Sequence, residues 1–226
     1  MLGEDLAIVW LSLRVAGAAV VCILPFGVAA GWGLSRWNGP GKHVIESCLT
    51  LPLVLPPTAI GMLLLSLLAR TAPLGRALDA LGIEIVFTWR AAVLAAGVMS
   101  LPLLVRAART SFEAVDPRLV GIARTLGDGP LRAFWRVELP LAWRGVVSGT
   151  LLAFCRALGE FGATILLAGN IPGRTQTLAL AIFQRSQTGR DASALTLIAI
   201  TSALAWVAVY AAELWAPRRA HSDVHR

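Results

Sequence analysis

Residues 6–34 read LAIVWLSLRVAGAAVVCILPFGVAAGWGL, an apolar run that contains one charged residue, Arg14. A helix needs about 20 consecutive apolar residues to cross the hydrocarbon core of a bilayer, so this run alone is long enough for a transmembrane helix. Four further apolar stretches follow at about 44–69, 87–108, 146–168 and 192–215. The sequence therefore predicts an all-α polytopic membrane protein with about five transmembrane helices, in a single domain over residues 6–216.

The composition of the chain agrees with this fold class. Of its 226 residues, 57% are hydrophobic and 15% are charged, and the mean hydropathy is +0.72. A soluble domain has roughly 45–50% apolar and about 25% charged residues, so an ordinary soluble protein and a disordered chain are both disfavoured. The three cysteines lie in apolar stretches without a Cys-x-x-Cys spacing, and we expect no metal site.

The formal net charge of +7 would suggest nucleic acid in a soluble protein. Here no segment resembles a basic surface interleaved with aromatic residues, and we expect no nucleic-acid partner. Twelve basic residues fall in segments 35–43 and 106–145 and in the tail after residue 216, whereas six fall in the opposite loops. Basic residues mark the cytoplasmic side of a membrane protein, which predicts an outside N-terminus and a cytoplasmic tail at 217–226.

The segment 110–145 is predicted to form two short helices outside the membrane. Asp116-Pro117 is a typical helix start and Gly127 a typical stop. Between them, apolar residues recur at helical spacing, at Leu119, Ile122, Ala123 and Leu126. A second short helix is expected to start at residues 128–130, with Leu131, Phe134 and Trp135 as its apolar stripe before Pro140. The apolar stripe either lies on the inner leaflet or docks into a groove of a partner protein.

The spacing within this loop resembles the loop motif of bacterial ABC importer permeases. The chain has Gly121-Ile122-Ala123, three residues, Gly127, nine residues, then Val137-Glu138-Leu139-Pro140. The family pattern is Glu-Ala-Ala, three residues, Gly, nine residues, Ile, any residue, Leu-Pro. The chain therefore departs at Gly121, Ile122 and Val137, and the missing Glu removes one polar contact. In that family the loop inserts into a cleft of a cytoplasmic ATPase, so the resemblance implies that the following residues couple to the ATPase: Gly121, Ile122, Ala123, Leu126, Gly127, Leu139 and Pro140.

Further segments resemble the molybdate permeases within this family. These are LSLRVA at 11–16, LPLVLPP at 51–57, ALGEFGAT at 157–164 and AGNIPGRTQT at 168–177. The resemblance implies a type I ABC importer permease of the bacterial inner membrane that transports molybdate and tungstate, with sulfate or another oxyanion as the alternative. It also implies a second copy of the chain, a cytoplasmic ABC ATPase dimer, an extracytoplasmic molybdate-binding protein and membrane lipid as partners. The chain itself would be non-catalytic and would hold no cofactor.

Polar residues within the apolar stretches are candidates for the transport path. Arg156 and Glu160 are four residues apart, hence on one helix face, and charged groups in a span usually face the bundle interior or water. They form either a structural pair or, with Thr164, part of the path of an oxyanion. A polar segment at 170–177 follows, either an ordinary loop or an outer mouth that meets the delivery protein through Asn170, Arg174, Thr175 and Thr177.

Missing motifs argue against other function classes. The chain has no Gly-x-x-x-x-Gly-Lys-Ser/Thr loop for ATP phosphates and no Gly-x-Ser-x-Gly. Its three histidines, His43, His221 and His225, lie outside the apolar stretches, which disfavours an intramembrane enzyme. A channel or secondary transporter is disfavoured because no internal repeat is present and the long amphipathic loop would be unexplained.

Overall fold

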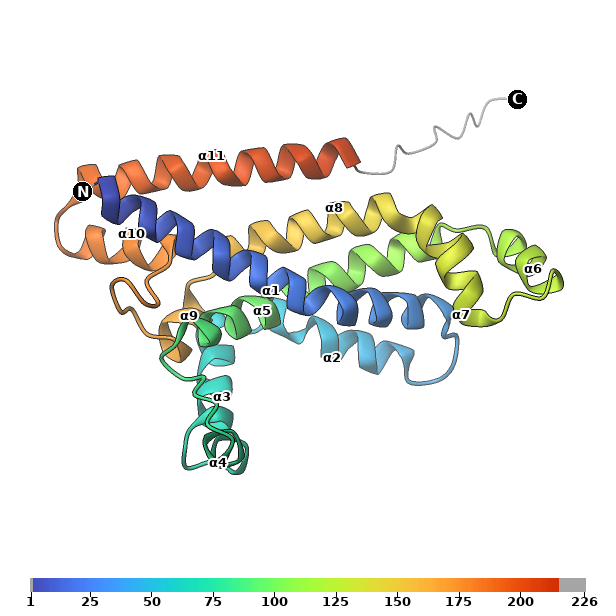
Figure 1. Cartoon of the computed structure of the whole chain (residues 1–226), viewed down its shortest axis with the longest axis horizontal. Helices are drawn as coiled ribbons and strands as arrows, with labels where there is room; N and C mark the ends of the chain where they lie inside the picture. Colours follow the sequence, from blue (N-terminus) through green and yellow to red (C-terminus); the bar gives the residue numbers. More distant parts are fainter. Residues whose placement is uncertain (1, 216–226) are drawn as a thin grey trace.

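The structure, a computed structural model, describes residues 2–215, and these contain helices, turns and loops but no strand. Within these residues there are up to five candidate membrane spans if one bent pair of helices counts as a single span. Four single helices are long and apolar enough to cross a membrane. They are α1 (Leu2–Arg36), α5 (Trp89–Glu113), the continuous helix formed by α7, η1 and α8 over Pro130–Leu158, and α11 (Asp191–Trp215). Figure 1 shows them lengthwise beside one another, with α5 packed on α1 and α8, and α11 on α8. This is the all-α, multi-span bundle that the apolar stretches predict.

The second apolar stretch forms two helices, where the sequence predicts one span at 44–69. α2 (Lys42–Val54) and α3 (Pro57–Leu68) are bent by 107° relative to each other. Proline lacks a backbone N–H and pushes the residue before it into extended backbone, and Leu55, which precedes Pro56, has φ −69° and ψ 146°. With 13 residues, α2 is about 20 Å long, shorter than the hydrocarbon core. A short helix, α4 (Pro73–Ala80), follows α3.

Small residues allow α1, α5 and α8 to approach closely. A Cβ on Gly149 of α8 would clash with the Cβ of Ala107 in α5, and a Cβ on Gly31 of α1 would lie 2.8 Å from the backbone nitrogen of Arg109. Lipid tails are as apolar as the side chains of a membrane helix, so close van der Waals contact, rather than escape from water, holds such helices together. The three helices therefore form the structural centre of the molecule.

The helix of the fourth apolar stretch begins and ends earlier than the predicted span at 146–168. α8 covers Leu139–Leu158, and the short α9 (Gly162–Leu167) begins after a break at residues 159–161. α9 packs on α3, and a Cβ on Gly162 would come within 2.7 Å of the Cβ of Pro57. α10 (Leu178–Gln187) leads from there into α11. The predicted tail at 217–226 lies outside the described residues.

The predicted loop at 110–145 contains α6 (Pro117–Thr125), which begins where the sequence predicts. The Asp116 carboxylate accepts a hydrogen bond from the Arg118 N–H at 2.8 Å. The second predicted helix begins at Pro130, within the predicted start, but it is not a separate short helix. α7 (Pro130–Ala133) and the π-helix η1 (Phe134–Glu138) continue directly into α8. The Leu139 N–H donates to the carbonyl of Phe134, five residues back, and this wide turn places Pro140 in the first turn of α8, where proline is tolerated.

Candidate functional site

α6 and α7 lie together at one end of the bundle, which we call the loop end; the N-terminus and α10 lie at the opposite end (Figure 1). On α6, Val120 and Ala123 are buried at 6% and 7% exposure. Leu119, Ile122 and Leu126 are 44%, 56% and 81% exposed, at helical spacing i, i+3 and i+7. The stripe predicted from sequence is thus divided: Ala123 anchors the helix, and the other three leucine and isoleucine side chains form an exposed row, here called the apolar row.

Both ends of α6 are fixed. Asp116 caps its start, and Gly127 follows its end with a left-handed φ of 93°, a conformation that favours glycine. The Asp128 N–H then donates to the Ala123 carbonyl at 3.1 Å. Gly121 and Gly127 are exposed and have nothing within 4 Å of an added Cβ. The helix therefore presents a short, rigid surface with open space around its glycines.

Basic and aromatic side chains surround the apolar row. The exposed Arg118 and Arg124 lie on α6, and Trp135 on η1 is 65% exposed. Arg132 and Arg136 both reach Asp128, with N–O distances of 3.7 and 3.3 Å. The surface at the loop end therefore combines an apolar centre with an excess of positive charge.

The remaining predicted coupling residues lie beside this surface. α6 packs on α7 and η1, which lead to half-buried Leu139 and exposed Pro140 at the start of α8. Leu139 packs against a buried cluster beneath α6 that includes Phe112, Val120 and Ala123. The structure therefore brings both halves of the motif together on one side of the loop end.

Glu138, which sequence reasoning passed over, is the buried polar centre of the loop end. Its side chain is 4% exposed and its Oε2 accepts from the Trp32 indole N–H at 2.6 Å and from the Arg36 guanidinium at 2.7 Å. Trp32 also packs on Phe134 with ring centroids 5.0 Å apart. The last turns of α1 are therefore held to η1 by charge, hydrogen bond and aromatic contact. A lone Glu between Val137 and Leu139 was the available signal.

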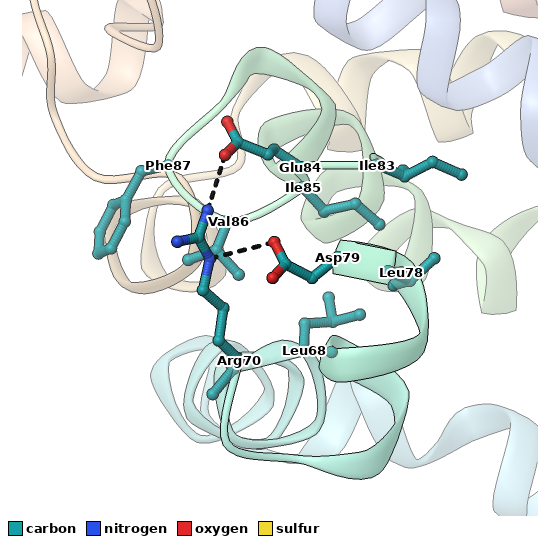
Figure 2. Close-up of a pocket in the computed structure, with 11 residues that line it drawn as sticks. Leu68, Arg70, Leu78, Asp79, Ile83, Glu84, Ile85, Val86 and Phe87 are labelled. Carbon is teal, nitrogen blue, oxygen red and sulfur yellow. Dashed lines mark hydrogen bonds and ion pairs between the residues drawn. The ribbon is translucent and has the colours of Figure 1, made fainter. Parts of the chain in front are cut away.

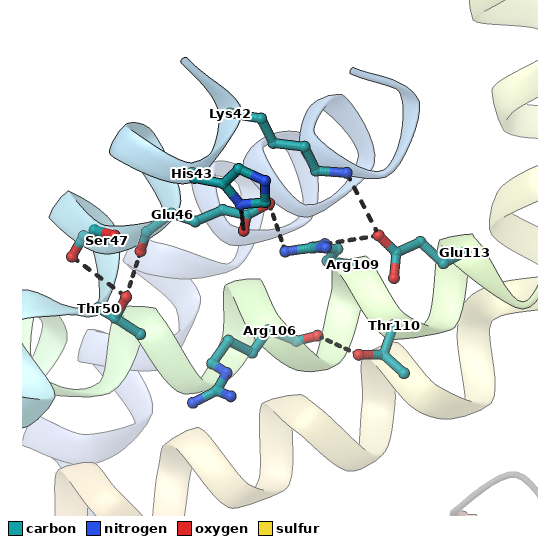
Figure 3. Close-up of polar contacts among 9 residues, drawn as sticks. All are labelled: Lys42, His43, Glu46, Ser47, Thr50, Arg106, Arg109, Thr110 and Glu113. Atoms are coloured by element: carbon teal, nitrogen blue, oxygen red, sulfur yellow. Dashed lines mark hydrogen bonds and ion pairs between the residues drawn. The ribbon is translucent and has the colours of Figure 1, made fainter. Parts of the chain in front are cut away.

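A second polar cluster at the loop end joins α2 to α5. Figure 3 shows Arg109 between the carboxylates of Glu46 on α2 and Glu113 on α5, with Lys42 also facing Glu113. The Arg109–Glu113 distance is 2.7 Å and the Lys42–Glu113 distance 3.8 Å. These charges hold the first turns of the broken span against the end of α5.

The predicted path residues Arg156, Glu160 and Thr164 lie around the break between α8 and α9. Arg156 donates to Glu160 Oε2 at 2.7 Å, and Glu160 Oε1 accepts from the Ala163 N–H at 2.8 Å. Glu160 and Thr164 are 2% and 1% exposed, whereas the Arg156 side chain is 27% exposed. Both carboxylate oxygens of Glu160 are thus occupied by partners within the chain, and Arg156 alone keeps an open side.

The predicted outer-mouth residues divide into buried and exposed members. Thr175 is fully buried; its hydroxyl accepts from the Ile171 N–H at 3.0 Å and donates to the Gly169 carbonyl at 3.3 Å. Asn170 is half-buried and donates to Gln184 of α10 at 3.1 Å. Thr177 is buried at the start of α10, and Arg174 is exposed. Thr175 and Asn170 therefore hold the loop through hydrogen bonds, whereas the buried Thr177 hydroxyl has no hydrogen-bond partner among the described residues. Arg174 is the exposed member of the set.

Comparisons with known proteins fit this architecture. A sequence model of the family described as "Binding-protein-dependent transport system inner membrane component" matches residues 23–221. The chain is 48% identical over 212 residues to the molybdenum transport system permease protein ModB of Escherichia coli K12, covering 93% of this chain and 92% of that protein. It is 39% identical over 198 residues to the putative molybdenum transport system permease protein YvgM of Bacillus subtilis, covering 87% and 83%.

The fold also matches a solved structure of the MetNI methionine ABC transporter in an inward-facing conformation. The TM-score is 0.74 over 95% of each chain, at 16% sequence identity, which is a likeness of fold. The family model covers most of the chain, and the two relatives match it over 93% and 87% of its length. The chain therefore belongs to the multi-pass inner membrane components of binding-protein-dependent transport systems, the permease family of ABC importers.

Proposed function

We propose that the chain is the membrane-spanning subunit of an ATP-driven molybdate importer, and that a separate cytoplasmic ABC ATPase hydrolyses the ATP. The apolar row of Leu119, Ile122 and Leu126 is the observation that carries this proposal. An exposed row at i, i+3 and i+7 on a helix is the pattern by which an amphipathic helix docks into a groove of a partner. The names of the relatives support molybdate as the substrate.

Docking explains the apolar row better than contact with the inner leaflet does. α6 has only nine residues and is fixed at both ends, whereas a helix that lies on a membrane relies on an extended apolar face. The apolar surface continues onto α7 and η1 through Leu131 and Trp135, which are 67% and 65% exposed. A compact apolar protrusion of this kind is suited to a cleft in a partner protein.

The other partners follow from the same proposal. The loop end lies in the cytoplasm and the N-terminus outside, in agreement with the basic residues at 106–145. Two copies of the chain enclose the path, each copy binds one subunit of an ATPase dimer, and an extracytoplasmic molybdate-binding protein delivers the anion near the exposed Arg174. The family description, which specifies dependence on a binding protein, supports the delivery step. The most exposed long helix, α11, has 11% of its most apolar window buried and faces lipid or the second copy.

The docking surface is tested by co-purification of the chain with its ATPase. We expect Ile122→Asp and Leu126→Asp to lower the amount of bound ATPase about 100-fold together, because each places a charge in an apolar contact. Leu81→Asp is the matched control: Leu81 is 73% exposed but follows α4, away from the loop end. The Leu81→Asp control should bind the ATPase fully. Full binding by the Ile122/Leu126 variant would exclude α6 as the docking element, and an equal loss in the control would show that the effect is not specific to α6.

The substrate is tested in proteoliposomes that contain the complete transporter and the delivery protein. We expect ATP-dependent uptake of molybdate, competition by tungstate and little competition by sulfate. Uptake without nucleotide would indicate a channel. Preferential uptake of sulfate would identify sulfate, and not molybdate, as the substrate. Arg156→Gln, with Thr150→Ser on the same helix as control, tests the path: a loss of uptake with intact assembly assigns Arg156 to it, and unchanged uptake leaves it a structural partner of Glu160.

A further inference from the structure

Three arginines from distant parts of the sequence line one groove near the end of the bundle opposite the loop end. Arg14 lies on α1, Arg90 in the first turn of α5 and Arg174 in the loop before α10. The groove has a volume of about 570 Å³, and Thr88 and Trp89 also line it. All three arginines are exposed, and among residues 2–215 none of them forms an ion pair. We call this the arginine groove.

The single carboxylate in the lining does not neutralise these arginines. Glu84 lines the groove, but its Oε1 is bound to Arg70 at 2.7 Å on its other side. Figure 2 shows Arg70 held between Glu84 and Asp79, with an Arg70–Asp79 distance of 3.4 Å. Because Glu84 is engaged there, the groove keeps a surplus of positive charge.

The local structure of the groove favours an anion. Arg14 lies over the Trp89 ring, 4.4 Å from its centroid, so a cation–π contact holds this guanidinium at the groove wall. Trp89 and Arg90 form the first turn of α5, which contains no acidic residue. The free N–H groups of a helix start carry partial positive charge, and they add to the guanidinium groups in the same lining.

The position of the arginines along their helices places the groove at a membrane surface. Residues 14 to 36 of α1 span about 33 Å and residues 90 to 109 of α5 about 29 Å, at 1.5 Å per residue. Both lengths are close to the roughly 30 Å hydrocarbon core, and Arg36 and Arg109 lie in the polar clusters of the loop end. Arg14 and Arg90 therefore lie at the opposite surface, where tryptophans such as Trp89 are also typical.

We propose that the arginine groove binds a tetrahedral oxyanion at this surface. Guanidinium groups donate paired hydrogen bonds to oxyanions, and three of them on separate segments can contact one anion from different directions. Two sources supply this chemistry: the oxyanion that the importer carries, which rests on the proposed function, and the phosphate of a phospholipid headgroup. Because each arginine is exposed to solvent, the anion is held loosely enough to leave.

The test uses the complete transporter, purified in detergent and in nanodiscs, with the double variant Arg90→Gln/Arg174→Gln. Arg76→Gln is the matched control, since Arg76 is an exposed arginine of α4 outside the groove lining. One arm measures binding of radiolabelled molybdate without the delivery protein. The other arm measures retained phosphatidylglycerol by native mass spectrometry. ATP-dependent uptake by the unmodified transporter is recorded in the same preparations.

If the ligand is the oxyanion that the importer carries, we expect the double variant to bind molybdate about 25-fold more weakly, or about fivefold for each arginine. The amount of retained lipid should then be unchanged. If the ligand is the phosphate of a lipid headgroup, we expect the double variant to lose the retained lipid and to bind molybdate as before. If both measurements equal those of the Arg76→Gln control, the groove binds no oxyanion and the inference is wrong. Failure of the unmodified transporter to take up molybdate would instead contradict the proposed function, and the lipid arm would still test the groove.

Discussion

Glu138 at the loop end and Glu160 near the break after α8 are both buried carboxylates paired with arginine, but they connect different parts of the chain. Glu138 joins Arg36 and Trp32, which lie more than 100 positions earlier in the sequence. Glu160 joins Arg156 and the Ala163 N–H, within four positions on either side. The first carboxylate holds two long helices together, whereas the second holds the ends of two consecutive helices.

The difference shows what each charge contributes to the fold. Removal of one partner from a buried ion pair leaves the other charge uncompensated, and the cost is largest where no water can replace the partner. Around Glu138, an indole N–H and a guanidinium converge on one oxygen. The two arginines are similarly exposed, 35% for Arg36 and 27% for Arg156, so their exposure does not separate the two sites. The partners of Glu160 are neighbours in the sequence, so loss of its charge leaves the contact between the long helices unchanged. We therefore expect the loop-end cluster to contribute more to stability.

The strongest test of this comparison is Glu138→Gln. We expect it to lower the free energy of unfolding by about 2–3 kcal/mol, less than for a fully buried pair because Arg36 is 35% exposed. Unfolding is measured by circular dichroism in dodecyl maltoside titrated with SDS. Glu113→Gln serves as the control. Because the Glu113 carboxylate is 40% exposed, this change should lower the free energy of unfolding by less.

The same substitution at the other carboxylate, Glu160→Gln, gives the next largest effect. The amide oxygen still accepts from the Ala163 N–H and the long helices keep their contacts, so we expect the free energy of unfolding to fall by about 1–1.5 kcal/mol in the same titration. A loss equal to or above that of Glu138→Gln would show that the local pair and the long-range pair are equivalent, and the comparison would not hold.

Trp32→Phe separates the hydrogen bond at Glu138 from the ion pair. It removes the indole N–H but keeps an aromatic ring against Phe134, and we expect a loss of about 1 kcal/mol. In the Glu138→Gln background the same change should cost less, because the two residues interact. Strictly additive losses in this double-mutant cycle would mean that the two side chains act independently.

Glu84→Gln is expected to change the free energy of unfolding least. The Arg70 and Glu84 side chains are 71% and 67% exposed, and exposed ion pairs contribute about 0–1 kcal/mol. We expect a change within about 0.5 kcal/mol in the SDS titration. A change as large as that of Glu160→Gln would indicate that burial does not determine how much each ion pair contributes to stability.

Local signals in the sequence predicted the elements that depend on a few neighbouring residues. The start of α6 at Asp116 and its end before Gly127 follow from backbone chemistry at those positions. The bend at Pro56 and Pro57 has an equally local cause, although it divides a stretch that the sequence predicts as one span. The spacing of Arg156 and Glu160 also predicted their contact, and they meet at 2.7 Å even though α8 ends at Leu158.

Features that depend on how helices are rotated and paired were not predictable in this way. The stripe on α6 contains four apolar residues, and only packing decides that Ala123 faces inward while Ile122 faces outward. The contact of Glu138 with Arg36 requires knowledge of which face of α1 meets η1. Likewise, the arginine groove gathers three segments whose separation in the sequence gives no indication of proximity.

The basic residues around the apolar row have a consequence for the kinetics of assembly. Arg118, Arg124, Arg132 and Arg136 are exposed, and Asp128 offsets only part of their charge. At physiological salt such charges act over about 8 Å. In the proposed complex we expect them to guide the approach of an acidic surface on the ATPase and to raise the association rate, which then falls with added salt. In the same proposed complex, Leu119, Ile122 and Leu126 become buried, and we expect their contacts to govern the dissociation rate instead. The surface formed by α6, α7 and η1 would thus set the rate of assembly through its charged rim and the lifetime of the complex through its apolar centre.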